Sequence, residues 1–156
     1  MPPVFTKSFA ERLTTLSEVT VNEAKQSQSF EPGTILIAPG DYHMRVKDSK
    51  HVQLDQGPKR NSVRPAADYL FESAVSVFGQ LVLGIVLTGM GNDGCDGCLA
   101  IKDKHGGVFI QDKASSVVWG MPAAVHDAGA FDRIGTLDEC ADLLNQFQAL
   151  AKIKVG

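Results

Sequence analysis

The sequence predicts an α/β fold: a three-layer, mostly parallel, doubly wound (Rossmann-like) sheet with one antiparallel hairpin. Candidate strands alternate with candidate helices along most of the chain, and this order gives a parallel sheet covered on both faces. The run at residues 81–88 is apolar and rich in Val, Leu and Ile, which is typical of a strand buried on both faces. Two short segments joined by the polar residues 47–50 predict the hairpin.

Each element follows from apolar periodicity and from the turn residues that bound it. Strands are predicted at residues 19–23, 34–38, 43–46, 51–54, 81–88, 107–111 and 130–134. Helices are predicted at residues 8–16, 65–78, 94–105, 120–127 and 137–152. Pro65 fits the first turn of its helix, because that turn leaves its N–H groups unused. Gly79 fits the end of the same helix, where a left-handed residue commonly closes the last turn.

Composition narrows the class of protein. The chain has 156 residues, 44% of them hydrophobic and 21% charged, which suits one domain with a core. The net charge is −3 and no dense Lys/Arg run occurs, so nucleic acid is not an expected partner. No apolar stretch approaches the roughly 20 residues of a membrane span, and the first residues lack a signal-peptide layout, so no membrane insertion is expected. Three cysteines, an odd number, favour reduced thiols in the cytoplasm.

The glycine-rich segment at residues 88–94 is the leading candidate for a functional site. It follows a predicted strand, and in open α/β sheets ligands and catalytic groups gather at the carboxyl ends of the strands. Residues 89–94 also match the dinucleotide pattern G-x-G-x-x-G. Against that interpretation, Asp93 would repel a pyrophosphate at the helix N-terminus, and the motif lies in the middle of the chain. A structural alternative is that Asp93 only caps the helix that follows it.

Other chemically suggestive residues have simpler interpretations. Cys95 and Cys98 have C-x-x-C spacing, but no second close pair completes a zinc site, so packing roles are favoured. Ser115 and Ser116 follow a strand, yet they also fit a helix cap, and the chain has no G-x-S-x-G motif. The histidines at positions 43, 51, 105 and 126 are scattered, and structural roles are expected for them. The basic residues within 60–64 suit a solvated loop better than an anion site.

The motifs together resemble a known family. The segment Thr-Gly-Met-Gly-Asn-Asp-Gly at residues 88–94 is similar to the hallmark of the catalytic domain of CheB-type chemotaxis protein-glutamate methylesterases. Further segments resemble the family in the same order along the chain: residues 2–13, 37–43, 64–71 and 114–122. The resemblance therefore extends over nearly the whole chain and involves several uncommon motifs in register.

The resemblance implies an activity and a site. Members of this family hydrolyse γ-glutamyl methyl esters on methyl-accepting chemotaxis receptors in the cytoplasm, releasing methanol, by a Ser-His-Asp mechanism without metal or cofactor. The aspartate of that mechanism carries over to Asp93, which would orient the histidine and stabilise its imidazolium form. The backbone N–H of Met90 resembles the family's proposed oxyanion donor. Gly89, Gly91 and Asn92 complete the implied active-site loop.

The same resemblance implies a departure from the family pattern. The family's serine lies in a glycine-rich turn after the first strand, and its histidine precedes a Met-Pro pair that corresponds to Met1-Pro2. We therefore expect residues 1–156 to form a single, incomplete catalytic domain that lacks the first strands and a receiver domain. Such a chain should be inactive alone, and its exposed sheet edges should favour self-association. A truncated piece, a misplaced start and a decayed paralogue all fit this expectation. A non-catalytic module that binds receptors or another partner remains the rival.

Overall fold

The computed structural model describes the backbone of residues 3–153 and the side chains of residues 4–146. The helices are α1 (Pro3–Leu16), α2 (Ala67–Phe78), α3 (Cys95–Asp103), α4 (Met121–Asp127) and α5 (Leu137–Ile153), with a 3-10 turn, η1, at Gly79–Leu81. The strands are β1 (Thr20–Glu23), β2 (Thr34–Ile37), β3 (His43–Val46), β4 (Val52–Asp55), β5 (Leu83–Val86), β6 (Gly107–Gln111) and β7 (Arg133–Gly135). Every predicted helix and strand has a counterpart in this order.

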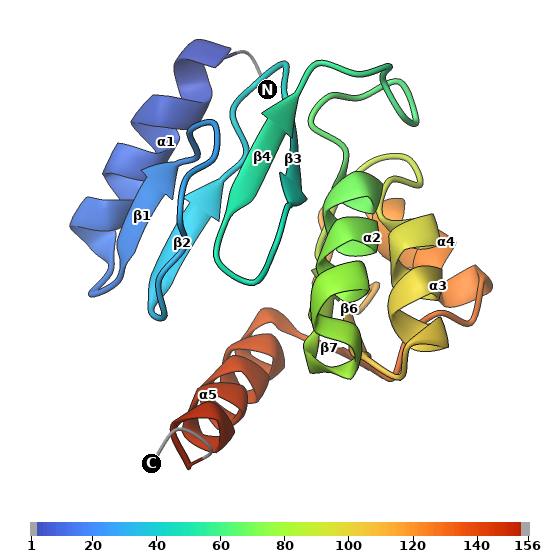
Figure 1. Cartoon of the computed structure of the whole chain (residues 1–156). Helices are drawn as coiled ribbons and strands as arrows, with labels where there is room; N and C mark the ends of the chain where they lie inside the picture. Colours follow the sequence, from blue (N-terminus) through green and yellow to red (C-terminus); the bar gives the residue numbers. More distant parts are fainter. Residues whose placement is uncertain (1–2, 154–156) are drawn as a thin grey trace.

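The predicted α/β class is confirmed, because most strand pairs are parallel and one antiparallel hairpin is present (Figure 1). Strands β1 and β2 pair in parallel, and β3 and β4 form the hairpin. Strands β5, β6 and β7 form a parallel sheet in that order. The described strands thus fall into three hydrogen-bonded groups rather than one continuous sheet.

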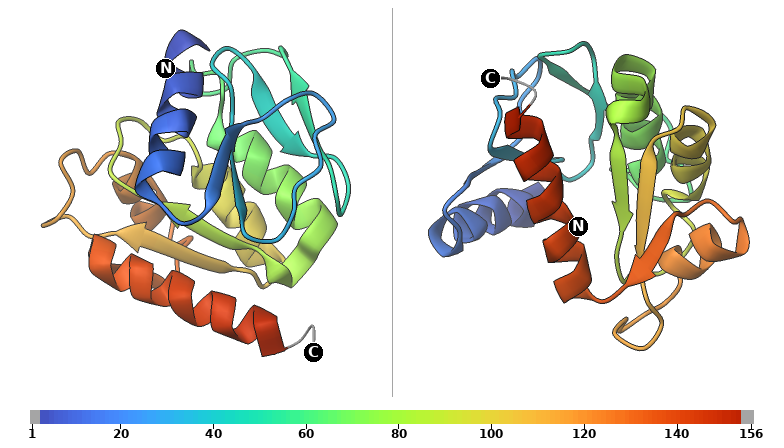
Figure 2. Two further views of the ribbon diagram at one scale, coloured as in Figure 1. Left: turned by 90° about the vertical axis from the view of Figure 1, so that its left-hand side faces the viewer. Right: turned by 90° about the horizontal axis from the view of Figure 1, so that it is seen from below.

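The three-stranded sheet lies between helices on both sides. Figure 2 shows α3 and α4 on one face of this sheet and α5 on the other. The larger of two hydrophobic cores lies on the α3 side, where the buried side chains come from α2, α3, α4, β5 and β6. Its fully buried members include Ile101, Val108, Ile110 and Val125. This core supports the strand end from which the glycine-rich segment departs.

A smaller core lies under the hairpin. Its buried residues are Ala24, Met44 and Val52, and Leu70 of α2 packs against them. On α2 itself, Val75 belongs to the larger core instead. Helix α2 therefore packs against both the larger core and the smaller core under the hairpin. It joins the part of the chain that precedes it to the three-stranded sheet that follows it.

Burial on β5, which lies within the strand predicted at residues 81–88, differs from the expectation of a strand buried on both faces. Strand β5 is only half-buried at Leu83 and Ile85, whereas β6 is buried from Val108 to Gln111. The reason is position: β6 lies between β5 and β7, while β5 has a hydrogen-bonded neighbour on one side only among the described strands. Alternate β5 residues face the larger core, as Val86 does. None of the helices within residues 3–153 is long and apolar enough to cross a membrane.

Candidate active site

The glycine-rich segment after β5 is bound tightly to the start of α4. The Gly89 N–H donates to the Val118 carbonyl at 2.9 Å, and the Gly89 carbonyl accepts from the N–H groups of Gly120 at 3.0 Å and Met121 at 2.8 Å. The Thr88 hydroxyl also donates to the Val118 carbonyl, at 3.0 Å. These bonds fix the path of the segment where it leaves the sheet.

Two glycines are required by the shape of this junction. Gly91 has φ +90°, a left-handed conformation that side-chain-bearing residues rarely adopt. At Gly120 the backbone approaches so closely that an added Cβ would lie 2.8 Å from the Gly89 carbonyl oxygen. The glycine-rich segment therefore depends on Gly91 for its left-handed backbone and on Gly120 for its close approach to the start of α4.

Met90 lies at the tip of the segment with a free backbone donor. Its side chain is 84% exposed. Its backbone N–H has no hydrogen-bond acceptor within the part of the chain that the structure describes. A fixed, unpaired peptide N–H can donate to an oxygen atom of a bound ligand.

Asp93 is anchored to the N-terminus of α2. Its carboxylate accepts the Ala67 N–H at 2.7 Å and the Asp68 N–H at 3.3 Å. The expected alternative, a cap on the helix that follows Asp93, is wrong, because α3 begins after Gly94 without a side-chain cap. The free N–H groups at a helix N-terminus are natural donors to a carboxylate, so this contact orients Asp93.

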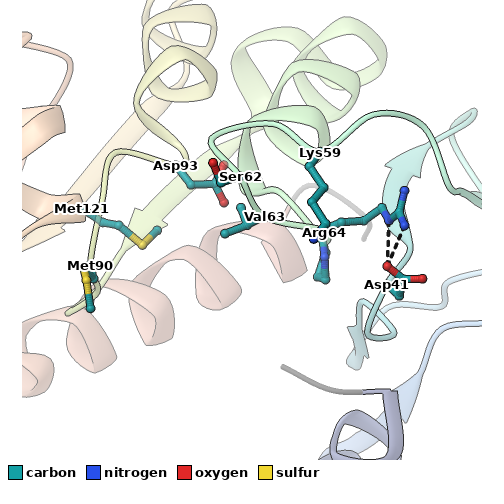
Figure 3. A pocket seen from close by; sticks show the side chains of 9 residues that line it. Asp41, Lys59, Ser62, Val63, Arg64, Met90, Asp93 and Met121 are labelled. Atoms are coloured by element: carbon teal, nitrogen blue, oxygen red, sulfur yellow. Dashed lines mark hydrogen bonds and ion pairs between the residues drawn. The ribbon is translucent and has the colours of Figure 1, made fainter.

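A pocket of about 660 Å³ opens beside Asp93 (Figure 3). It is lined by Asp41, Lys59, Ser62, Val63, Arg64, Pro65, Met90, Asp93 and Met121. Figure 3 shows the two methionines at one end and Lys59, Arg64 and Asp41 at the other, with Asp93 between them. Met90 and Asp93 thus face one cavity, together with residues from the loop that precedes α2.

Buried His43 holds this loop in place, a role that sequence analysis did not assign. The ring is fully buried; its Nε2 lies 3.0 Å from the Pro58 carbonyl and its Nδ1 3.2 Å from the Ala66 N–H. Those partners fit a neutral imidazole with the proton on Nε2, a state inferred from the hydrogen bonds. The ring also contacts Tyr69 edge-on, with centroids 4.6 Å apart. His43 therefore joins the start of the loop to the start of α2.

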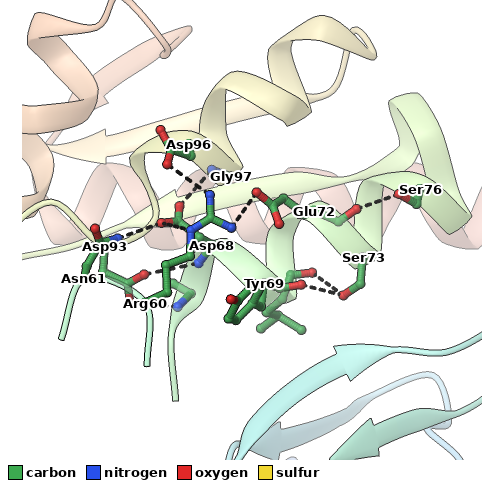
Figure 4. A network of polar contacts seen from close by, with 12 residues as sticks. Arg60, Asn61, Asp68, Tyr69, Glu72, Ser73, Ser76, Asp93, Asp96 and Gly97 are labelled. Atoms are coloured by element: carbon green, nitrogen blue, oxygen red, sulfur yellow. Dashed lines mark hydrogen bonds and ion pairs between the residues drawn. The ribbon is translucent and has the colours of Figure 1, made fainter. Parts of the chain in front are cut away.

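Arg60 ties the loop to α2 and α3 through three carboxylates (Figure 4). Its guanidinium lies 3.3 Å from Asp68, 2.7 Å from Glu72 and 3.0 Å from Asp96. Asp68 has no exposed side-chain surface and also accepts the Gly97 N–H at 2.8 Å. Burial raises the pKa of Asp68, and the Gly97 N–H and Arg60 act against that rise.

Arg64 closes the other end of the loop. It donates to one oxygen of Asp41 from Nε at 3.1 Å and from Nη2 at 2.7 Å. Its Nη1 donates to the carbonyls of Gln56 and Gly57, each at 2.8 Å. The hydrogen bond from Arg64 lowers the pKa of Asp41 and keeps that carboxylate charged.

Comparison with known proteins identifies the family. The family model described as CheB methylesterase matches residues 1–144. The chain belongs to the CheB methylesterase family. The crystal structure of the Thermotoga maritima CheB methylesterase catalytic domain superposes with a TM-score of 0.83 at 40% identity, covering 87% of this chain and 74% of that one.

Curated relatives carry one shared name, protein-glutamate methylesterase/protein-glutamine glutaminase. The protein from Nocardioides sp. is 50% identical over 137 residues, which are 86% of this chain and 37% of the relative. A second, from Caulobacter vibrioides, is 47% identical over 143 residues, 89% of this chain and 41% of the relative. The chain thus spans less than half the length of the curated CheB relatives it matches.

The cysteines of this CheB-family chain lie away from the pocket lining. Cys98 is fully buried, and burial raises the pKa of its thiol to about 12, which makes it a poor nucleophile. The Cys95 thiol donates to the Ala124 carbonyl at 3.4 Å. No group of three or more His, Cys, Asp or Glu side chains in the described part of the chain could hold a metal ion.

The remaining sequence candidates are not brought to the pocket. Ser115 bonds Asp112, and the exposed His126 stacks on Phe131 with ring centroids 5.3 Å apart. None of the described histidines hydrogen-bonds Asp93. The structure therefore brings together Asp93, Met90 and the loop before α2, and it places no described serine-histidine pair beside them.

Proposed function

We propose that this chain carries the aspartate and the oxyanion-binding elements of a protein-glutamate methylesterase centre acting on cytoplasmic parts of chemotaxis receptors. The observation that supports it best is the position of Asp93: a carboxylate at the end of a parallel strand, oriented by the α2 amides and lining the same pocket as the free Met90 N–H. Residues 1–156 would act as one domain, without metal or cofactor.

The chemistry divides between the two groups. In ester hydrolysis of this type, a histidine takes the proton of the attacking serine, and a carboxylate orients that histidine and stabilises its charged form. Asp93 fits the carboxylate role, since two helix N–H bonds leave part of its acceptor capacity free. The Met90 N–H, with Gly89, Gly91 and Asn92 shaping the loop around it, would meet the charge that develops on the ester oxygen.

The same arrangement would also act on a glutamine side chain. The curated relatives are named for glutaminase as well as methylesterase activity. Attack on an ester and on a primary amide gives the same kind of tetrahedral oxyanion, and only the leaving group differs, methanol in one case and ammonia in the other. We therefore include receptor glutamine deamidation in the proposal.

A chimaera tests this proposal. The serine- and histidine-bearing strands of the Thermotoga maritima domain would be joined ahead of residue 1, and methanol release from methylated receptor would be measured. We expect turnover by the chimaera and a loss of about 10⁴-fold in kcat for Asp93→Asn, as when a triad carboxylate is neutralised in serine proteases. The 156-residue chain alone should release no methanol.

The matched control is Asp112→Asn, because Asp112 also follows a strand of the same sheet but lies outside the pocket lining. It should leave kcat unchanged. A chimaera that folds but releases no methanol, or one whose turnover survives Asp93→Asn, would show that the proposed roles are wrong.

We also propose self-association through open strand edges. Strands β2 and β5 each have a hydrogen-bonded neighbour on one side only, among the strands that the structure describes. Open edges pair readily with other strands. Sedimentation over a range of concentrations should therefore show reversible oligomers, and a monomer at every concentration would count against this.

A further inference from the structure

We propose that Lys59 is a specificity-determining residue that binds a substrate carboxylate close to the reacting glutamyl side chain. The preferred substrate would then be an acidic peptide segment rather than any segment bearing the ester. The inference rests on the proposed function and deepens it by naming the class of substrate. The observation behind it is that Arg60 and Arg64 in the loop before α2 form ion pairs, whereas Lys59 does not.

Lys59 is the one basic side chain of this loop that makes no salt bridge within the described residues; its charge acts on Asp41 only through space, and Arg64 already pairs with that carboxylate. Arg60 is paired with three carboxylates, and Arg64 is paired with Asp41. Lys59 is exposed and lines the pocket, and it forms no ion pair with any residue in the described range. Its cation is therefore available to a ligand.

The backbone that carries Lys59 is fixed on both sides. Before it, the Pro58 carbonyl is held by buried His43 at 3.0 Å. After it, the Arg60 side chain is anchored to α2 and α3, and the Arg60 and Val63 backbones exchange hydrogen bonds of 3.2 and 2.9 Å. Such preorganisation lowers the entropy lost on binding, so even one flexible lysine side chain can contribute to selectivity.

The two ends of the pocket differ in polarity. Met90 and Met121 form its apolar end, Lys59 lies at the charged end, and Asp93 lies between them (Figure 3). The Asp41 charge is balanced by Arg64, and the Asp93 charge faces the α2 N-terminus, which leaves the Lys59 end positive. A substrate whose ester lies at Met90 and Asp93 would therefore gain from a carboxylate on the Lys59 side.

Binding to the 156-residue chain tests this without requiring turnover. Two capped peptides would each carry a central γ-methyl glutamyl ester, flanked by glutamates in one and by glutamines in the other. Isotope-labelled protein would be titrated with each and followed by NMR. We expect the acidic peptide to bind about three- to tenfold more tightly at low salt, with the advantage shrinking as salt screens the charge.

Charge variants test whether Lys59 causes the preference for the acidic peptide. Lys59→Gln should remove the preference for the acidic peptide, and Lys59→Glu should reverse it. Lys47→Gln is the matched control, because Lys47 is also exposed but lies at the far end of β3, outside the pocket lining. The control should keep the full preference. Thermal melting of each variant would show that the fold is intact.

Three outcomes overturn the inference: equal binding of the two peptides, a preference that survives Lys59→Glu, or no binding of either peptide. The proposed function fails separately, through a chimaera that shows no turnover or does not depend on Asp93. A Lys59-dependent preference in the chain alone would stand even if the chimaera result went against Asp93, so the two failures are distinguishable.

Discussion

The two walls of the pocket are built in different ways. One wall, the segment at residues 89–94, stands on the carboxyl end of β5 above the larger hydrophobic core and is shaped by glycines. The other wall, the loop at residues 57–65, has little apolar support and is held by buried or half-buried polar side chains: His43, Arg60 and Arg64. Apolar packing positions the first wall, whereas hydrogen bonds and ion pairs position the second.

The difference has an energetic consequence. Removing apolar volume beneath the first wall leaves a cavity, and its cost does not depend on pH. Removing one polar partner from the second wall leaves another group buried without its bond, and that cost depends on protonation. The two walls should therefore respond differently to substitution and to acid.

The largest effect is expected beneath the first wall. Ile110 of β6 is fully buried in the larger core, so Ile110→Ala should lower the free energy of unfolding by about 3–5 kcal/mol. Ile134→Ala on β7 is the matched control, since Ile134 is 45% exposed, and it should cost under about 1 kcal/mol. Urea denaturation measures both. Equal losses would mean that the larger core does not carry this wall.

The second wall should be sensitive to Arg60. Arg60→Gln leaves the fully buried Asp68 carboxylate without its cation, and we expect a loss of about 2–4 kcal/mol at neutral pH. Burial already raises the pKa of Asp68, and removing Arg60 removes one group that opposes the rise. The penalty is therefore full above the raised pKa that Asp68 has in the Arg60→Gln chain, and it fades as the pH falls from that pKa toward the lower one that Asp68 has beside Arg60.

The measurement is the difference in unfolding free energy between Arg60→Gln and the unsubstituted chain, followed from neutral to acid pH. Taking the difference removes the acid sensitivity of carboxylates that both proteins share, such as Asp55 and Asp132, whose pKa values are lowered. Arg133→Gln, at an exposed position without a described ion pair, is the control and should change little. A deficit that stays constant with pH would rule out Asp68 as its source.

The two walls were not equally visible in the sequence. The first is a contiguous motif after an apolar run, so its place at a strand end followed from periodicity alone. The second depends on contacts between residues far apart in the chain, such as Arg60 with Asp96 and His43 with Ala66. The sequence favoured a solvated loop at residues 60–64, because isolated charged residues have no periodicity from which their ion-pair partners can be predicted.

Asp93 shows the same limit on a smaller scale. Its position at the end of a strand was predicted, and the structural alternative made it a cap of the next helix, but its hydrogen-bond donors lie on α2 instead. Asp68 gave a related signal that was missed, a carboxylate on the inward face of an amphipathic helix, where burial requires compensating donors. Charged residues at apolar positions of a helix could thus have pointed to the second wall.

The smallest predicted effect concerns the junction between the first wall and α4. Gly120 has φ −83° and ψ −63°, which alanine adopts readily, so any cost of Gly120→Ala comes from crowding. The added Cβ would lie 2.8 Å from the Gly89 carbonyl oxygen and 3.2 Å from the Met90 Cα, so the loop must shift. We expect a loss of about 1–2 kcal/mol in unfolding free energy, together with a change in the Met90 amide resonance. Gly107→Ala is the control, because its Cβ would meet only the end of the Leu83 side chain, which can move. An unchanged Met90 resonance in Gly120→Ala would mean that α4 does not fix the Met90 N–H, and the first wall would then depend on the core beneath it alone.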